Sequence, residues 1–241
     1  MPLYRAVIFD LFYTLINPLD SACMRNNEYE VLGMKREDFE SRNSAQYERW
    51  AGGSIRDPVE ILRQILKGLD YPEPFIRAAT GARIERVRRG LFDVAKKNLA
   101  LLETLRQDGL KIALVSNADV IDTKYWKSSP LASCFDVAVF SWEVGFLKPD
   151  PRIYALVLER LNLKSGDCLY VGDGGHGELR GAKEAGISTV LTTEYIQNLW
   201  PEKIPALKAW ADHVIDDMDG LQAALQIGQN IPVFQDNSQI A

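Results

Sequence analysis

Short apolar runs alternate with longer amphipathic stretches along most of the chain. Runs that are apolar on both faces are typical of strands in a parallel sheet that helices cover on both sides. The stretches between them have the apolar spacing of helices. The sequence therefore predicts an α/β fold. The predicted strands are residues 4–9, 111–115, 137–140, 168–171, 188–191 and 213–215.

A long segment between the first two predicted strands has no comparable strand pattern. It predicts helices at residues 21–31, 36–50, 58–69 and 73–90, with turn signals between them. We therefore expect a parallel-sheet core made of residues 1–16 and 93–227. A second, smaller, all-helical cap domain (17–92) would be inserted after the first strand. Residues 228–241 lack apolar periodicity and predict a loosely held tail.

Composition narrows the possible functions. The chain has 241 residues, 46% of them hydrophobic, which is enough for a substantial core. A formal charge of −5 argues against a nucleic-acid surface. No signal peptide or membrane-spanning run is present, and three widely spaced cysteines form no Cys-x-x-Cys pair. We expect a soluble cytoplasmic protein with no nucleic-acid or membrane partner; its oligomeric state stays open.

Arginine is concentrated in the predicted cap. Residues 17–92 contain 11 arginines and 2 lysines against 12 acids. A planar guanidinium matches carboxylate and phosphate geometry, so one or two of these arginines could bind a small anionic substrate. For any single arginine, a solvated helical face is the simpler interpretation.

Polar residues lie at four places along the predicted core, three of them directly after predicted strands. Asp10 ends the first strand, Ser116 and Asn117 follow the second, Lys148 precedes a helical run, and Asp173 follows the fourth strand. Each could be a cap, a loop residue or a turn residue. Because the carboxyl ends of parallel strands meet in one crevice, their joint placement predicts a single site. Asp10 is the candidate nucleophile.

These residues, together with the segment Gly172-Asp173 through Glu178-x-Arg180-Gly181-Ala182-Lys183, resemble the haloacid dehalogenase-like (HAD) superfamily of hydrolases. The resemblance covers nearly the whole core and includes the position of the helical insert. It implies a Rossmann-like core, an aspartate nucleophile and a cap that closes over the strand ends.

The resemblance also implies roles for single residues. Asp10 would form a covalent intermediate, which splits one difficult displacement into two. Thr14 and Ser116, with Asn117 beside it, would hold the nucleophile and the transferred group, and Lys148 would neutralise developing charge. In the phosphatase members Mg²⁺ would be bound by Asp10, the backbone carbonyl of Phe12 and Asp173, an oxygen set that suits this ion.

Two further residues of the same motif carry open interpretations. Glu178 would act outside the metal's immediate ligands, or it would be a surface helix acid. His176 could line the site, although an exposed loop position is the simpler expectation.

One position departs from the phosphatase pattern. Phosphatase members carry aspartate two residues after the nucleophile as general acid, and this chain has Phe12. Dehalogenase members resemble the chain in an aromatic residue there, in the Ser116-Asn117 pair and in Tyr154, six residues after Lys148. They need no metal and usually lack an acid at the position of Asp173.

Several functions therefore stay open. Asp173 favours Mg²⁺-dependent hydrolysis of a small phosphorylated metabolite. The first alternative is 2-haloacid dehalogenation without metal. Others are hydrolysis of an ester with a good leaving group, an acyl phosphate or a phosphonate, and an inactive binding or regulatory module.

Overall fold

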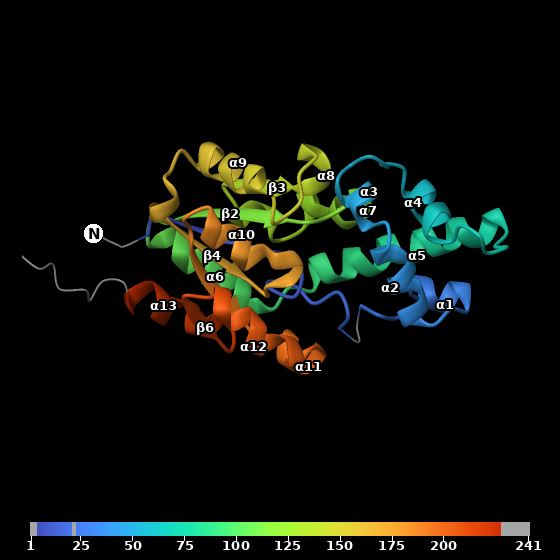
Figure 1. The fold of residues 1–241 in the computed structure, drawn as a ribbon. Coiled ribbons are helices and arrows are strands. Elements are labelled where there is room, and N and C mark those ends of the chain that lie inside the picture. The colour runs from blue at the N-terminus through green and yellow to red at the C-terminus, as the bar shows by residue number, and fades with distance from the viewer. Residues whose placement is uncertain (1–3, 21–22, 228–241) are drawn as a thin grey trace, which may run out of the picture.

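The computed structural model describes residues 4–20 and 23–227 of the chain. At its centre lies a six-stranded parallel sheet in the order β3-β2-β1-β4-β5-β6 (Figure 1). The strands are β1 (Ala6–Phe9), β2 (Lys111–Ser116), β3 (Val137–Phe140), β4 (Cys168–Gly172), β5 (Ser188–Thr192) and β6 (His213–Ile215). The predicted α/β fold and all six predicted strands are thereby confirmed.

Helices cover both faces of this sheet. Val7 and Phe9 of β1 pack into one apolar cluster with helix α6, whereas Ala6 and Ile8 pack into another with helix α9. This alternation explains why the central strands are apolar at every position. The core helices are α6 (Lys96–Gln107), α7 (Val120–Thr123), α8 (Ser141–Val144), α9 (Pro151–Leu161), α10 (Glu178–Glu184), α11 (Ile196–Leu199), α12 (Ile204–Leu207) and α13 (Leu221–Ile227). Short 3₁₀ segments lie at Trp126–Ser128, Ala132–Cys134, Ser165–Asp167, Gly175–Gly177, Pro201–Lys203, Lys208–Trp210 and Met218–Gly220.

The helices of the insert lie together beyond one end of the sheet (Figure 1). They are α1 (Glu28–Leu32), α2 (Arg36–Ser44), α3 (Tyr47–Ala51), α4 (Pro58–Ile65) and α5 (Glu73–Phe92). Trp50, Ile61 and Leu62 are fully buried in a cluster of their own. The insert therefore has an apolar core separate from the two clusters that flank the sheet.

Helix α5 connects the insert to the sheet. Ile76 and Ala79 near its start belong to the cap cluster, whereas Val87 and Leu91 near its end belong to a sheet cluster. Because one helix contributes to both cores, the domain limits of 17–92 for the cap and of 1–16 and 93–227 for the core stay a prediction. The predicted tail, 228–241, lies outside the described residues.

The insert's helix limits differ from the prediction in three places, one of which is the helix expected at 58–69, which ends at Ile65. Residues 21 and 22 of the helix expected at 21–31 lie outside the described residues, and residues 23–26 form turns. The first helix begins at Glu28, because the Asn27 side chain accepts hydrogen bonds from the N–H groups of Tyr29 and Glu30 and so caps it. The helix expected at 36–50 is divided into α2 and α3. Asn43 and Ser44 end α2, and such side chains compete with the helical backbone for hydrogen bonds. The division lets Trp50 reach the cap interior, where it is fully buried.

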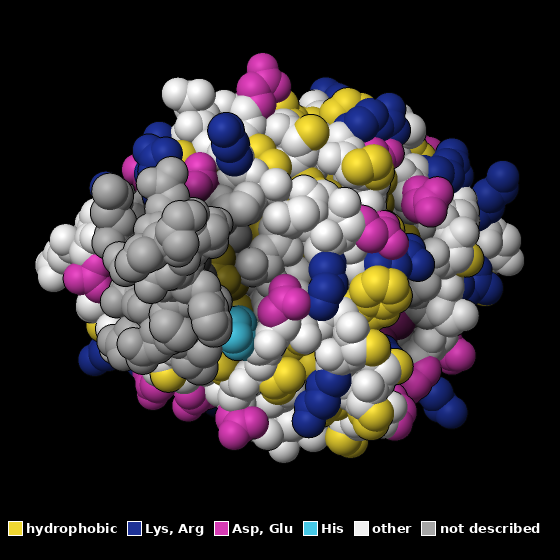
Figure 2. Space-filling model, turned by 60° about the vertical axis from the view of Figure 1, so that its left-hand side comes forward, with side chains coloured by type: hydrophobic (Ala, Val, Ile, Leu, Met, Phe, Trp, Pro, Cys, Tyr) yellow, Lys and Arg dark blue, Asp and Glu magenta, His cyan; other side chains and the backbone are white. Residues whose placement is uncertain are grey.

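The surface carries charges of both signs. The face in Figure 2 has Lys and Arg side chains interspersed with Asp and Glu. Among residues 4–20 and 23–227, no helix is both long and apolar enough to cross a membrane.

Candidate active site

The carboxyl ends of the central strands converge on one cavity of about 1000 Å³. Asp10 follows β1 and Asp173 follows β4, its neighbour in the sheet. The backbone N–H of Asp10 donates to the carbonyl of Val171, which extends the β1–β4 pairing to the edge of the crevice (2.9 Å). Asp10, Phe12, Asn117, Lys148 and Asp173 all line this cavity, so residues far apart in the sequence lie at one site.

Lys148 is the cation at the centre of the site. Its side chain is only 2% exposed, and Nζ donates to Asp10 Oδ1 at 2.5 Å and to a carboxylate oxygen of Glu178. It also lies 3.0 Å from the hydroxyl of Tyr170. Asn117 fixes the backbone of this lysine: its side-chain amide donates to the Lys148 carbonyl and accepts from the Lys148 N–H. The ammonium group is thereby held beside the candidate nucleophile.

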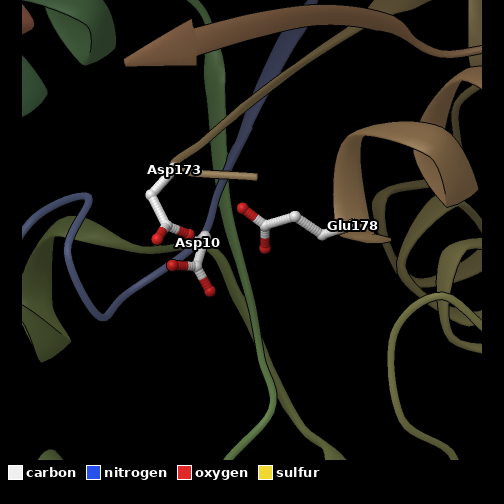
Figure 3. A group of neighbouring side chains, drawn as sticks. All are labelled: Asp10, Asp173 and Glu178. Atoms are coloured by element: carbon white, nitrogen blue, oxygen red, sulfur yellow. The ribbon is translucent and has the colours of Figure 1, made fainter. Parts of the chain in front are cut away.

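Three buried carboxylates surround this one ammonium group. Carboxylate oxygens of Asp10, Asp173 and Glu178 lie within 4.8 Å of one another. Figure 3 shows the three groups pointing toward a common space, Asp10 and Asp173 from strand ends and Glu178 from the start of α10. At such separations, two like charges repel by about 3–4 kcal/mol at an effective dielectric of 20.

The pKa values reflect this crowding. Burial, and then the charge of Glu178, raise the pKa of Asp10 to about 7 although Lys148 opposes the shift. Burial, Glu178 and Asp10 likewise raise the pKa of Asp173 well above its usual range. Burial alone would lower the pKa of Lys148, but the charges of Asp10 and Glu178 outweigh it and raise the value. The cluster therefore lacks positive charge.

The oxygen atoms of this cluster fit a hard divalent cation. Asp10 and Asp173 offer carboxylate oxygens, and within the described part of the chain no group donates a hydrogen bond to the Phe12 carbonyl. Both oxygens of Glu178 already accept protein hydrogen bonds, one from Lys148 and Tyr170 and the other from the Gly174 N–H. Asp10, Asp173 and the Phe12 carbonyl therefore fit the oxygen set that Mg²⁺ prefers, with Glu178 outside it.

Glu178 is 1% exposed, so the interpretation as a surface helix acid is wrong. Its approach depends on Gly172, because a Cβ at that position would lie 2.1 Å from Glu178 Oε1. The Tyr154 hydroxyl donates to the Glu178 carbonyl at 2.8 Å and holds the start of α10. Tyr154 is fully buried and is not among the residues that line the cavity.

Thr14 and Ser116 are also fully buried. Their hydroxyl oxygens have no hydrogen-bond partner among the described residues, and neither residue lines the cavity. Buried hydroxyls are normally hydrogen-bonded, so each of these two unpartnered groups calls for an explanation. Their roles in holding a transferred group stay a prediction.

A family model of haloacid dehalogenase-like hydrolases matches residues 4–186. The chain belongs to this family.

Two curated relatives and two solved structures illustrate the similarity. The putative phosphatase YhcW of Bacillus subtilis is 30% identical over 232 residues, 92% of this chain and 95% of the relative. The phosphoserine phosphatase of Thermus thermophilus is 33% identical over 126 residues, 52% of this chain but only about half (49%) of the relative.

The solved structures share the fold at low identity. L-2-haloacid dehalogenase from Xanthobacter autotrophicus has a TM-score of 0.67 at 20% identity, with coverage of 92% of this chain and 98% of that one. The magnesium-bound putative HAD-hydrolase YfnB from Bacillus subtilis has a TM-score of 0.68 at 18% identity, with coverage of 92% and 99%.

The cap supplies the other wall of the cavity in this HAD-like hydrolase. Tyr47 of α3 stacks on the ring of His176, with centroids 5.2 Å apart and planes 14° apart. The Tyr47 hydroxyl donates to the Asn117 carbonyl at 3.0 Å. His176 is exposed, as expected for a loop position, and it also lines the cavity beside Tyr47. The sequence carried no signal of this contact, because its partner comes from the cap.

Two of the cap arginines, Arg83 and Arg86 of α5, also line the cavity. Arg86 donates to both oxygens of the fully buried Glu28. Arg83 donates to Asp119 at 2.6 Å and lies 3.6 Å from Asp122. Both guanidinium charges are thus balanced by buried acids that the sequence pattern did not single out.

Proposed function

We propose that this HAD-like hydrolase cleaves phosphate monoesters of small metabolites in a Mg²⁺-dependent reaction through a covalent Asp10 intermediate. The observation that carries the proposal is the cluster of Asp10, Asp173 and Glu178 around the single ammonium of Lys148. Three carboxylates and one ammonium leave an excess of negative charge that a divalent cation would compensate. The relatives named as phosphatases support the same reaction class.

Asp10, Asp173 and the Phe12 carbonyl would hold the ion. When bound, Mg²⁺ would neutralise part of the charge on the phosphoryl oxygens and keep the crowded carboxylates ionised. We propose the reducing cytoplasm as the setting.

The chain's own groups would divide the remaining work. The Asp10 carboxylate attacks phosphorus, and Lys148 stabilises the charge that develops beside it. Asn117 keeps the lysine in place through its two hydrogen bonds to the Lys148 backbone. Thr14 and Ser116, whose hydroxyls have no hydrogen-bond partner among the described residues, would donate to the transferred group.

The runner-up is 2-haloacid dehalogenation. Phe12 favours it, because a halide leaves without a proton and needs no acid at this position. Tyr154 no longer favours it, since its hydroxyl is committed to the Glu178 carbonyl outside the cavity. An anionic haloacid would also add negative charge beside Asp10, Asp173 and Glu178.

Two product assays separate these functions. The proposal predicts phosphate release from 4-nitrophenyl phosphate that stops when a chelator is added and resumes with Mg²⁺. Dehalogenation predicts chloride release from 2-chloropropionate that ignores the chelator. Asp10→Asn, purified in parallel, controls for contaminating phosphatases. Failure of phosphate release at every Mg²⁺ concentration would overturn the proposal, and failure of both assays would favour an inactive module.

A further inference from the structure

Several aromatic side chains contribute to the lining of the cavity. Phe12, Tyr13, Tyr47, Phe146 and Trp200 all line it and are half-buried, so part of each side chain is open to the cavity. Aromatic surface of this kind binds flat apolar groups by stacked or edge contacts, each worth about 0.5–1.5 kcal/mol beyond area burial.

Two ring pairs keep this wall in shape before any substrate binds. Tyr13 and Trp200 form an edge contact with centroids 5.0 Å apart, and Tyr47 stacks on His176. Tyr13 has a positive φ of 57°, and so does His176 at 53°. Backbone strain of about 1–3 kcal/mol at a non-glycine residue persists only where surrounding contacts maintain it. The Tyr13–Trp200 contact lies within the core, and the Tyr47–His176 contact joins the cap to the core.

The two cap arginines of the cavity do not favour a second anionic group on the substrate, because each is already paired with acids. Arg83 is balanced by Asp119 and Asp122, and Arg86 is balanced by Glu28. The Nη1 atom of Arg83 donates to no described atom, but this atom is buried. Outside the acidic cluster, the group that leaves with the ester oxygen therefore meets aromatic surface and two arginines that are already paired. The exposed Lys203 also lines the cavity, with its ammonium 4.5 Å from the centre of the Trp200 ring.

Among the described residues that lie next to Asp10, no group is free to protonate the leaving oxygen. Phe12 carries no proton to donate. The Lys148 ammonium is engaged by Asp10 and Glu178. The Asp173 carboxylate belongs to the proposed metal ligands. A leaving oxygen without a proton departs as an anion, which is far easier for a phenol, with a pKa of about 10, than for an alkanol, whose value lies near that of water at about 15.7.

We infer that the substrates are phosphate monoesters of aromatic alcohols, in which the ester oxygen is attached directly to the ring that lies against the aromatic wall. This inference rests on the proposed phosphatase function and narrows it to one class of leaving group. Both features then select the same substrates: the missing acid at position 12 favours a phenolic leaving group, and the aromatic lining binds its ring.

The reaction balances without a protein acid. An Asp10 oxygen bonds to phosphorus as the phosphorus–oxygen bond to the ring breaks, and the phenolate that leaves takes a proton from solvent. Water then attacks phosphorus, the bond to Asp10 breaks, and the carboxylate is regenerated. Both hydrogens of that water end on the released dihydrogen phosphate.

Three matched substrates test the inference on the wild-type protein with Mg²⁺. Phenyl phosphate has an aromatic ring and a phenolic oxygen, benzyl phosphate has an aromatic ring and an alkanol oxygen, and cyclohexyl phosphate has an alkanol oxygen and no aromatic ring. General acid catalysis contributes about 10²- to 10⁴-fold where it operates. Since this chain lacks a general acid at position 12, we expect kcat/KM for phenyl phosphate to exceed kcat/KM for benzyl and for cyclohexyl phosphate by at least about 10²-fold. Benzyl phosphate should have a lower KM than cyclohexyl phosphate because its ring can stack.

Two variants at position 12 connect the effect to this residue. Phe12→Asp should raise kcat for benzyl and cyclohexyl phosphate by about 10-fold or more while changing that for phenyl phosphate little, because only alkanols need the acid. Phe12→Leu supplies neither an aromatic ring nor an acid, so it should not raise kcat for benzyl phosphate or for cyclohexyl phosphate. A phenyl-to-benzyl ratio that Phe12→Asp leaves unchanged would overturn the role of position 12.

The outcomes also separate this inference from the function on which it rests. Chelator-sensitive turnover of cyclohexyl phosphate within about threefold of phenyl phosphate would refute the aryl preference and leave the phosphatase proposal intact. A preference for O-phosphoserine over phenyl phosphate would refute it as well. No phosphate release from any ester would contradict the phosphatase proposal itself. If the variants fail to fold, the three-substrate comparison on the wild-type protein decides alone.

Discussion

The two sides of the cavity differ in how their charges are balanced. On the sheet side, Asp10, Asp173 and Glu178 share the single ammonium of Lys148, and their negative charge is not fully compensated. On the cap side, the charge of each lining arginine is matched by buried acids. The sheet side is thus suited to hold a cation and perform chemistry, and the cap side to shape the space for the leaving group.

The largest effect should come from the sheet side. Asp10→Asn removes the nucleophile, and loss of a nucleophile costs on the order of 10⁴- to 10⁶-fold in kcat. The fold should survive, because the neutral amide relieves repulsion with Asp173 and Glu178. Rates of 4-nitrophenyl phosphate hydrolysis and thermal melting of the metal-free protein measure both effects. The exposed Asp108→Asn is the matched control and should keep wild-type activity. Activity of Asp10→Asn within tenfold of wild type would remove Asp10 from the mechanism.

The next largest effect should come from the paired charges of the cap. Glu28→Gln leaves Arg86 buried without a counter-charge, which costs about 3–5 kcal/mol. Glu85→Gln breaks an exposed pair with Arg88 and should cost about 0.2–1 kcal/mol. Urea unfolding of the two variants measures the difference. Equal losses of unfolding free energy would mean that Arg86 does not depend on its buried ion pair. The cap arginines would then be candidates for substrate binding again.

The same pair predicts a pH dependence. Burial alone would raise the pKa of Glu28, but Arg86 outweighs it, so the net pKa is lowered. A carboxyl with a lowered folded-state pKa stabilises the protein above its unfolded value of about 4.3 and loses that contribution as the pH falls through the folded value. The stability gap between wild type and Glu28→Gln should therefore be full at pH 7 and shrink below pH about 4. A gap that stays constant down to pH 3 would contradict the assigned ion pair.

The smallest effect should come from the cap–sheet contact at Tyr47. Tyr47→Phe removes only the hydrogen bond to the Asn117 carbonyl. It should lower the free energy of unfolding by about 0.5–1.5 kcal/mol and change KM little. Tyr47→Leu also removes the stacking on His176 and should raise KM for phenyl phosphate several-fold. Identical kinetics for the two variants would show that the aromatic wall does not contact substrate.

How far the sequence predicts the molecule depends on the range of each interaction. The strands and Asp10 at the end of β1 follow from local apolar patterns, and the sheet edge then collects the other strand-end residues. The start of α1 was missed because a single side chain, Asn27, decides it. The pairs Arg83–Asp119 and Arg86–Glu28 join residues 36 and 58 positions apart, and no local pattern reports such contacts. The stacking of His176 on Tyr47 likewise depends on where the cap lies.

The most direct test of the account is to trap the intermediate. The protein is mixed with Mg²⁺ and phenyl phosphate labelled with ³²P, quenched in acid within one turnover, digested and sequenced by mass spectrometry. We expect the label on the peptide that contains Asp10, and its loss in Asp10→Asn. Turnover of the substrate with no label on that peptide, or with label on another residue, would contradict the central claim.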